Sequence, residues 1–163
     1  MKIGIIIPAH NEANYIEKTL DSLVNQSHLP DLLCVVDDHS TDHTSEIITH
    51  YANQFDWICM ASIKSSESRI PGAKVINAWN KGLTFLTHCD IVCKFDADLI
   101  FPKNYISELV KRFSEDEQLG VLGEYFKFWT TIRNGLMKTY QIRTMCVVQS
   151  KPTKKNVCMK SVG

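Results

Sequence analysis

Short apolar runs alternate with segments of helical periodicity over the first 120 residues of the chain. Runs of this length are typical of buried strands, and they predict strands at about 3–7, 32–36, 57–62 and 90–95. Apolar residues at helical spacing predict helices between and after them, at 13–26, from a cap at Thr41 or Asp42 through Tyr51, at 73–86, and from Pro102 through Phe113. The alternation predicts the α/β class, with a Rossmann-like, mostly parallel sheet and flanking helices.

The pattern weakens after residue 120. A fifth strand is expected near Val121 and residues 125–129 are compatible with a strand, but residues 130–163 show no sustained period. The charge also changes, since residues 1–120 carry 10 Lys and Arg against 17 Asp and Glu, whereas residues 121–163 carry 8 against the single acid Glu124. We therefore expect a domain over 1–123, followed by a basic tail over 124–163 that is a truncated or an out-of-frame continuation.

Composition and length fit one globular domain, with 44% hydrophobic and 22% charged residues in a chain of 163. We find no secretory signal, and no run approaches the roughly 20 apolar residues of a membrane span. The six cysteines show no Cys-x-x-Cys spacing. Cys34 and Cys93 fall inside predicted strands, where cysteine acts as a small hydrophobic residue. These features predict a reduced, cytoplasmic protein.

Polar residues follow three of the predicted strands. These are Pro8 to Glu12, Asp37 and Asp38, and the pair Asp96 and Asp98. The carboxyl ends of parallel strands meet at one edge of a sheet, where open α/β folds bind ligands. Each group also has a structural interpretation: helix capping by Asn11, a turn with a cap at Asp37 and Asp38, and a solvated loop at Asp96 and Asp98.

Missing motifs narrow the function classes. No Gly-x-Gly-x-x-Gly follows the first strand, which argues against a dinucleotide-dependent oxidoreductase. The sequence also lacks a Walker lysine loop, which argues against an NTPase. The Gly-rich basic loop of a sugar-pyrophosphorylase type of nucleotidyltransferase is also missing from that position. The paired carboxylates instead suit a hard divalent cation such as Mg²⁺ or Mn²⁺, which bridges to phosphates.

Four blocks of the sequence stand out together: Ile5-Ile-Ile-Pro-Ala-His-Asn-Glu12, Val35-Val-Asp-Asp-His-Ser-Thr-Asp42, Gly72-Ala-Lys-Val-Ile-Asn-Ala-Trp-Asn80 and Lys94-Phe-Asp-Ala-Asp98. These four blocks resemble the family 2 glycosyltransferases. The resemblance covers about residues 1–120 in the family's order. It implies the GT-A fold and transfer of a sugar, with inversion, from a UDP- or GDP-sugar donor to a saccharide or lipid-linked acceptor.

The resemblance also implies roles for individual residues. Donor nucleotide contacts are expected from Pro8, Ala9, Glu12, Asp38, Lys74 and Asp96. Of these, Asp38 would contact the base, Lys74 would lie near the nucleotide with Arg69 as a second candidate, and Asp96 would contact the ribose or the metal. Asp98, with Asp96, would hold Mn²⁺ or Mg²⁺ on the diphosphate.

The resemblance implies one element that we do not find. Inverting members use an acidic general base from the second half of the domain, and the tail offers only Glu124, which follows Gly123 too closely to match. We therefore expect an incomplete fold with no identified catalytic base. The alternatives are a non-catalytic nucleotide- and metal-binding fragment or an unrelated nucleotide-binding α/β domain. We expect no nucleic-acid partner, and peripheral contact with the inner face of the membrane if the acceptor is lipid-linked.

Overall fold

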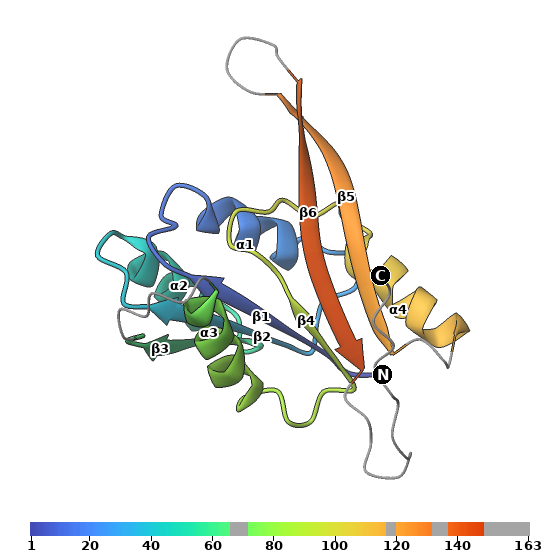
Figure 1. The fold of residues 1–163 in the computed structure, drawn as a ribbon, viewed down its shortest axis with the longest axis horizontal. Helices are drawn as coiled ribbons and strands as arrows, with labels where there is room; N and C mark the ends of the chain where they lie inside the picture. The colour runs from blue at the N-terminus through green and yellow to red at the C-terminus, as the bar shows by residue number, and fades with distance from the viewer. Residues whose placement is uncertain (66–71, 117–119, 132–136, 149–163) are drawn as a thin grey trace.

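The computed structural model describes residues 1–65, 72–116, 120–131 and 137–148. Strands and helices alternate through its first two thirds and a pair of long strands follows (Figure 1). The elements are β1 (Ile3–Ala9), α1 (Ile16–Val24), β2 (Leu32–Asp38), α2 (Thr44–Gln54), β3 (Ile58–Ile63), α3 (Ala73–Leu83), β4 (Ile91–Lys94), α4 (Tyr105–Glu115), β5 (Val121–Thr131) and β6 (Met137–Val148).

The described strands form one six-stranded sheet in the order β3-β2-β1-β4-β6-β5. Strands β3, β2, β1 and β4 are parallel to one another, and β6 pairs antiparallel with both β4 and β5. The crossovers between parallel strands require the intervening helices, which is why the alternating pattern was informative. The predicted α/β class with a mostly parallel sheet is confirmed.

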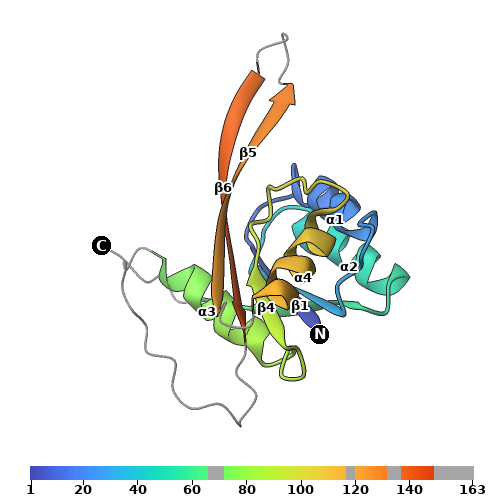
Figure 2. The ribbon, with the colours of Figure 1, turned by 90° about the vertical axis from the view of Figure 1, so that its right-hand side faces the viewer.

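The helices cover the two faces of the sheet unequally. Helices α1, α2 and α4 lie on one face and α3 lies on the other (Figure 2). Alternate residues of each strand therefore enter different cores, since Ile5 and Ile7 pack with α1 whereas Ile6 packs with α3. Both faces of the central strands are buried, which explains their continuous apolar runs.

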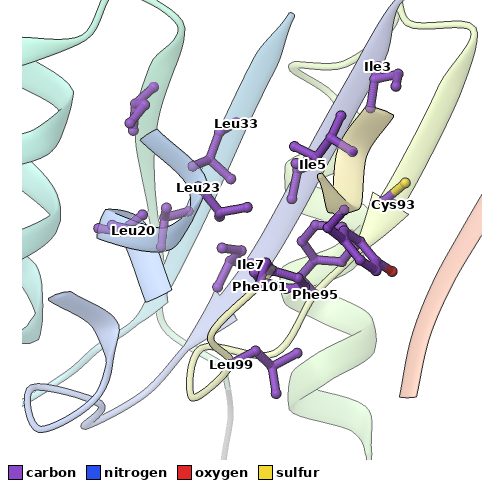
Figure 3. Packing of buried hydrophobic residues seen from close by; sticks show 14 of the residues in the cluster. Ile3, Ile5, Ile7, Leu20, Leu23, Leu33, Cys93, Phe95, Leu99 and Phe101 are labelled. Atoms are coloured by element: carbon purple, nitrogen blue, oxygen red, sulfur yellow. The ribbon is translucent and has the colours of Figure 1, made fainter. Parts of the chain in front are cut away.

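An aromatic cluster lies at the end of β4, in the larger of the two cores (Figure 3). The ring centroid of Phe95 is 4.5 Å from that of Phe101 and 5.6 Å from that of Tyr105. All three side chains are buried. Their packing holds the chain on both sides of Asp96 and Asp98, so the core fixes the backbone on which these carboxylates are carried.

The ends of two helices and the strands after residue 120 differ from what the sequence predicted. Helix α1 begins at residue 16 rather than 13, and α4 begins at Tyr105, after a turn in which its N–H donates to the carbonyl oxygen of Pro102 at 2.9 Å. Strand β5 was expected, but β6 was not, because its residues alternate too little to show a strand period. The domain boundary expected after residue 123 falls within β5.

The expectation of reduced cysteines is wrong for one pair. Cys93 and Cys146 are disulfide-bonded across β4 and β6, where they are register partners with Cα atoms 4.0 Å apart. The pairing depends on β6, which sequence reasoning did not find. Cys34, Cys59 and Cys89 are free thiols, as expected. Among the described residues, no helix is both long enough and apolar enough to cross a membrane.

Candidate functional site

The ends of β1, β2 and β4 bring their polar residues to one edge of the sheet. Ala9 is the register partner of Asp37, and Ile6 is the partner of Lys94, so the chain leaves all three strands at neighbouring positions. The predicted convergence of these segments is therefore present in the structure. It follows from parallel pairing alone, which places successive carboxyl ends on one side.

Side-chain hydrogen bonds join the turn after β1 to the turn after β2. The N–H of Asn11 donates to Ser40 Oγ at 2.9 Å, and the N–H of Thr41 donates to Asn11 Oδ1 at 2.8 Å. His10 Nδ1 donates to the carbonyl oxygen of Asp38 at 2.7 Å. Asn11 thus bridges two turns, whereas the predicted helix cap is not formed, since α1 begins at Ile16 without a side-chain cap. This network makes the two turns one rigid unit.

Backbone strain accompanies this network. Asn11 has a φ of 57° and His39 a φ of 55°, the left-handed region that side chains other than glycine seldom adopt. One strained residue lies in each of the joined turns. Such conformations persist only where surrounding contacts hold them, and they concentrate at binding sites.

The two carboxylates at the end of β2 have different environments. Asp37 accepts hydrogen bonds from the hydroxyls of Ser40 and Ser45. It therefore stabilises the turn after β2, which is one of the two roles that the sequence suggested for it. Asp38 is 6% exposed, and its Oδ1 accepts the N–H of Ser65 at 2.7 Å. Its Oδ2 is buried and has no hydrogen-bond partner in the described part of the chain. A buried carboxylate oxygen without a donor is costly, and it is available to a ligand N–H.

Carboxylates from β1 and β4 approach each other closely enough to interact. The pKa of Glu12 is raised, chiefly by burial, then by the negative charges of Asp98 and Asp42 and also by that of Asp96. Asp98 is exposed, whereas Asp96 is half-buried and forms an ion pair with Lys94. This edge of the sheet therefore accumulates negative charge, which favours a cation.

Helix α1 supports the segment that carries these carboxylates. The hydroxyl of Thr19 donates to the carbonyl oxygen of Ala97 at 2.7 Å, and the N–H of Phe101 donates to Ser22 Oγ at 3.1 Å. Gln26, two residues beyond the end of α1, donates through Nε2 to the carbonyl oxygen of Pro102 at 2.7 Å. Sequence reasoning missed these supports because it weighed only the apolar stripe of the helix. Their spacing of three and four residues was the available signal.

The structure shows fewer contacts for the remaining site residues that the sequence predicted. Lys74 is exposed in the first turn of α3, and Arg69 lies outside the described residues. Pro8 and Ala9 end β1 beside β2. No group of three or more His, Cys, Asp or Glu suited to a metal ion forms within the residues that the structure describes. A metal at this edge would therefore take part of its coordination from a ligand.

Comparison with known proteins gives a family. Residues 4–145 match the model for glycosyl transferase family 2. A probable glycosyltransferase of Bacillus subtilis, YdaM, is 31% identical over 147 residues, which is 89% of this chain and 34% of that protein. The match extends beyond the change of charge at residue 120 and includes both long strands up to residue 145.

Two solved structures give the same result. S. aureus TarS in complex with UDP-GlcNAc has a TM-score of 0.58 and 27% identity, over 72% of this chain and 32% of that one. The glucosyl-3-phosphoglycerate synthase of Mycobacterium tuberculosis, with Mn²⁺, UDP and glucosyl-3-phosphoglycerate, has a TM-score of 0.53 and 25% identity, over 74% of this chain and 42% of that one. The predicted GT-A fold is confirmed. This chain spans about a third of the length of YdaM, at 34%.

Proposed function

The chain belongs to glycosyl transferase family 2, and we propose that it binds a UDP- or GDP-sugar through the edge formed by β1, β2 and β4 and transfers the sugar, with inversion, to an acceptor hydroxyl with the help of Mn²⁺ or Mg²⁺. The acceptor in this proposal is a saccharide or a lipid-linked acceptor. The donor contacts are those expected from the sequence: Pro8, Ala9, Glu12, Asp38, Lys74 and Asp96, with Asp98 and Asp96 at the metal.

The free oxygen of Asp38 is the observation that carries the proposal. Asp38 Oδ1 is satisfied by the N–H of Ser65, but Oδ2 is buried and lacks a donor in the described residues. Uracil and guanine each present a ring N–H able to donate to such an oxygen. Binding of the base would replace an unsatisfied buried acceptor by a charge-assisted hydrogen bond, which is worth more than a bond between neutral groups.

The donor set at the end of β4 fits a hard divalent cation. Asp98 offers an exposed carboxylate, and the raised pKa of Glu12 reflects, after burial, the repulsion from Asp98 and Asp42. Oxygen ligands and a local excess of negative charge favour Mg²⁺ and Mn²⁺. A bound cation would supply Lewis-acid stabilisation of the diphosphate leaving group. Asp96 and Asp98 would hold it, and Glu12 would line the nucleoside.

A second candidate is a nucleotide- and metal-binding fragment without turnover. All the residues in the proposed site precede residue 100, and residues 121–163 contain the single acid Glu124, so no general base is assigned. Transfer of the sugar to an acceptor or to water supports the transferase, and saturable binding without either supports the fragment. Both candidates require the same donor site.

Calorimetric titration with UDP and GDP, each with and without Mn²⁺, tests that site. We expect saturable binding that depends on Mn²⁺ for at least one nucleotide. Asp98→Ala should abolish the Mn²⁺-dependent binding of nucleotide while the circular dichroism spectrum is retained. Asp38→Asn should weaken nucleotide binding by about tenfold or more, because the amide N–H₂ would face the base N–H in place of an acceptor.

A matched control is Asp56→Ala. Asp56 is an exposed acid that precedes β3, at the opposite edge of the sheet. This variant should bind like the unaltered protein. Unchanged Mn²⁺-dependent binding in Asp98→Ala would remove the metal assignment, and a folded chain that binds neither nucleotide would refute the proposed function.

A further inference from the structure

Lys94, the last residue of β4, forms an ion pair with Asp96, the first acid of the Asp-x-Asp segment. We propose that Lys94 is an internal counter-cation that leaves Asp96 for the donor diphosphate when a divalent metal binds, and so couples the binding of metal to that of nucleotide. The inference rests on the proposed function and assigns to Lys94 a positioning role that the expected donor and metal contacts do not include.

The position of Lys94 is an unfavourable one for a lysine. It belongs to a central strand whose other residues, Ile91, Val92 and Cys93, are all buried. The Lys94 side chain is 21% exposed, whereas that of Asp96 is 44% exposed. An ammonium group that is largely withdrawn from water is favoured by an anion beside it, whereas an apolar residue would suit the strand without one.

The ion pair between Lys94 and Asp96 opposes the binding of a metal to Asp96. Asp98, Asp42 and Asp96 all act on Glu12 and, after burial, raise its pKa, so the carboxylates form one interacting group. Lys94 neutralises part of that charge by its contact with Asp96. A divalent cation on the same carboxylate would repel the ammonium strongly at such short range. In the nucleotide-free protein, Lys94 and the metal should therefore compete for Asp96.

A diphosphate changes this competition, because it offers the ammonium another anion. Lysine carries its charge on a flexible four-carbon stem and binds phosphate as a point charge. With the diphosphate bound, Lys94 can turn to a phosphate oxygen while Asp96 turns to the metal. Each ligand then removes an obstacle to the other, which is a positive coupling free energy between two sites.

Measurement of Mn²⁺ affinity tests this coupling without any turnover. Free Mn²⁺ is followed by electron paramagnetic resonance in the presence of the protein, with no nucleotide and with saturating UDP, after correction for the Mn²⁺–UDP complex in solution. The variant is Lys94→Met, which has an unbranched side chain one atom shorter and removes the charge. We expect its nucleotide-free Mn²⁺ affinity to rise by about threefold to tenfold, as a half-buried opposing charge is lost.

UDP should raise the Mn²⁺ affinity of this variant less than it raises that of the unaltered protein. The difference should again be about threefold to tenfold, because Lys94 no longer competes with Mn²⁺ for Asp96. Lys94→Arg should preserve the behaviour of the unaltered protein, since it keeps the charge. Lys81→Met is the matched control, because Lys81 is an exposed lysine of α3 that lies over the ring of Phe85. If Lys94→Met loses its circular dichroism spectrum, Lys94→Gln provides the same test with a polar side chain.

The outcomes separate the inference from the proposed function. Unchanged nucleotide-free Mn²⁺ affinity in a folded Lys94→Met or Lys94→Gln, with UDP still bound in the presence of Mn²⁺, would overturn the role of Lys94 and leave the proposed function intact. A lower melting temperature with no change in either Mn²⁺ affinity would reduce the ion pair to a structural contact and also overturn the inference. Failure of the unaltered protein to bind UDP at all would refute the proposed function itself.

Discussion

The hydroxyl of Thr19 in α1 donates a hydrogen bond to the carbonyl oxygen of Ala97 at 2.7 Å, and Ala97 is the residue between Asp96 and Asp98. Thr19 has no exposed surface. The contact spans 78 residues of sequence and ties the acidic segment to the helix that follows β1. The backbone between the two carboxylates is therefore held by a helix that supplies none of the proposed metal ligands.

Replacement of Thr19 by valine tests this support. Thr19→Val keeps the shape of the side chain but leaves the carbonyl oxygen of Ala97 without its donor, at a cost of about 1–3 kcal/mol in the free energy of unfolding. We also expect Mn²⁺-dependent UDP binding to weaken by about tenfold, since a small displacement of a binding group is costly. Chemical denaturation and calorimetry measure the two effects. Thr19→Ser should restore both, and nucleotide affinity that is unaltered in Thr19→Val would contradict the positioning role.

Asp42 should make stability depend on pH. Its pKa is lowered, first by the hydrogen bond from the hydroxyl of Thr44 and also by the N–H groups of Thr44 and Ala13. A carboxyl whose pKa is lower in the folded state stabilises the fold above its ordinary value of 3.8, and this contribution is lost as the pH falls through the folded value. Asp42→Asn should therefore lower the melting temperature only slightly at pH 7, because the Asp42 side chain is exposed to solvent.

The difference between Asp42→Asn and the unaltered protein should shrink as the solution becomes more acidic. Melting curves recorded by circular dichroism from neutral to acidic pH measure it. Asp56→Asn, at an exposed acid before β3, is the control and should show no such pH-dependent difference. A difference in melting temperature that stays constant down to the most acidic pH would contradict the assignment.

Gly82 should resist the substitution that usually stabilises a helix. A Cβ added at Gly82 would lie 2.6 Å from Ile6 Cγ2 and 2.8 Å from Ile6 Cγ1, so α3 approaches β1 too closely for a methyl group. Alanine normally gains about 1 kcal/mol over glycine inside a helix. Overpacking costs about 1–3 kcal/mol, and we expect Gly82→Ala to be destabilising overall.

A double-mutant cycle with Ile6→Ala isolates the clash between Gly82 and Ile6. The cost of Gly82→Ala should disappear when Ile6 is already alanine, because the two atoms that a new Cβ would meet most closely are then absent. Urea denaturation of the four proteins provides the free energies. Additive effects of the two substitutions would show that the helix and strand do not touch as described.

The thiol groups of Cys93 and Cys146 should disappear together when the reduced protein is oxidised, because they form one disulfide. Two protein thiols and glutathione disulfide would give the protein disulfide and two molecules of glutathione, leaving two fewer free thiols than the six cysteines of the sequence. The bond closes a separation of 53 residues, which the chain-entropy model values at about 4 kcal/mol. Thiol titration of the denatured protein and peptide mapping without reductant measure the pairing.

Cys146→Ser is the control for this pairing. It should leave Cys93 free to react with an alkylating reagent after denaturation, and the stabilisation by glutathione disulfide should be absent. Recovery of an alkylated Cys93 from the oxidised, unaltered protein would show that the two sulfur atoms do not bond.

The sequence by itself determined the βα alternation and the edge at which the chemistry gathers. Apolar runs and helical stripes are local properties, so β1 to β4 and the helices between them could be inferred within a few residues of their bounds. Parallel pairing then required Asp38, Asp96 and Asp98 to follow strand ends on one side of the sheet. The four motif blocks, read in order, identified the family.

Tertiary structure alone decided which of those residues are free to bind a ligand. Asp37 and Asp38 are adjacent and identical in type, yet one is taken by Ser40 and Ser45 while the other keeps an unpaired oxygen. The hydroxyls that satisfy Asp37 come from residues only three and eight positions further along the chain, whereas the support of Ala97 by Thr19 spans 78 residues.

The same holds for the order of the last strands. Strand β6 lies between β4 and β5, which brings Cys146 opposite Cys93. Local propensity and periodicity contain no information on register between distant segments, because a strand's partner is chosen by side-chain packing and hydrogen bonding across the whole sheet.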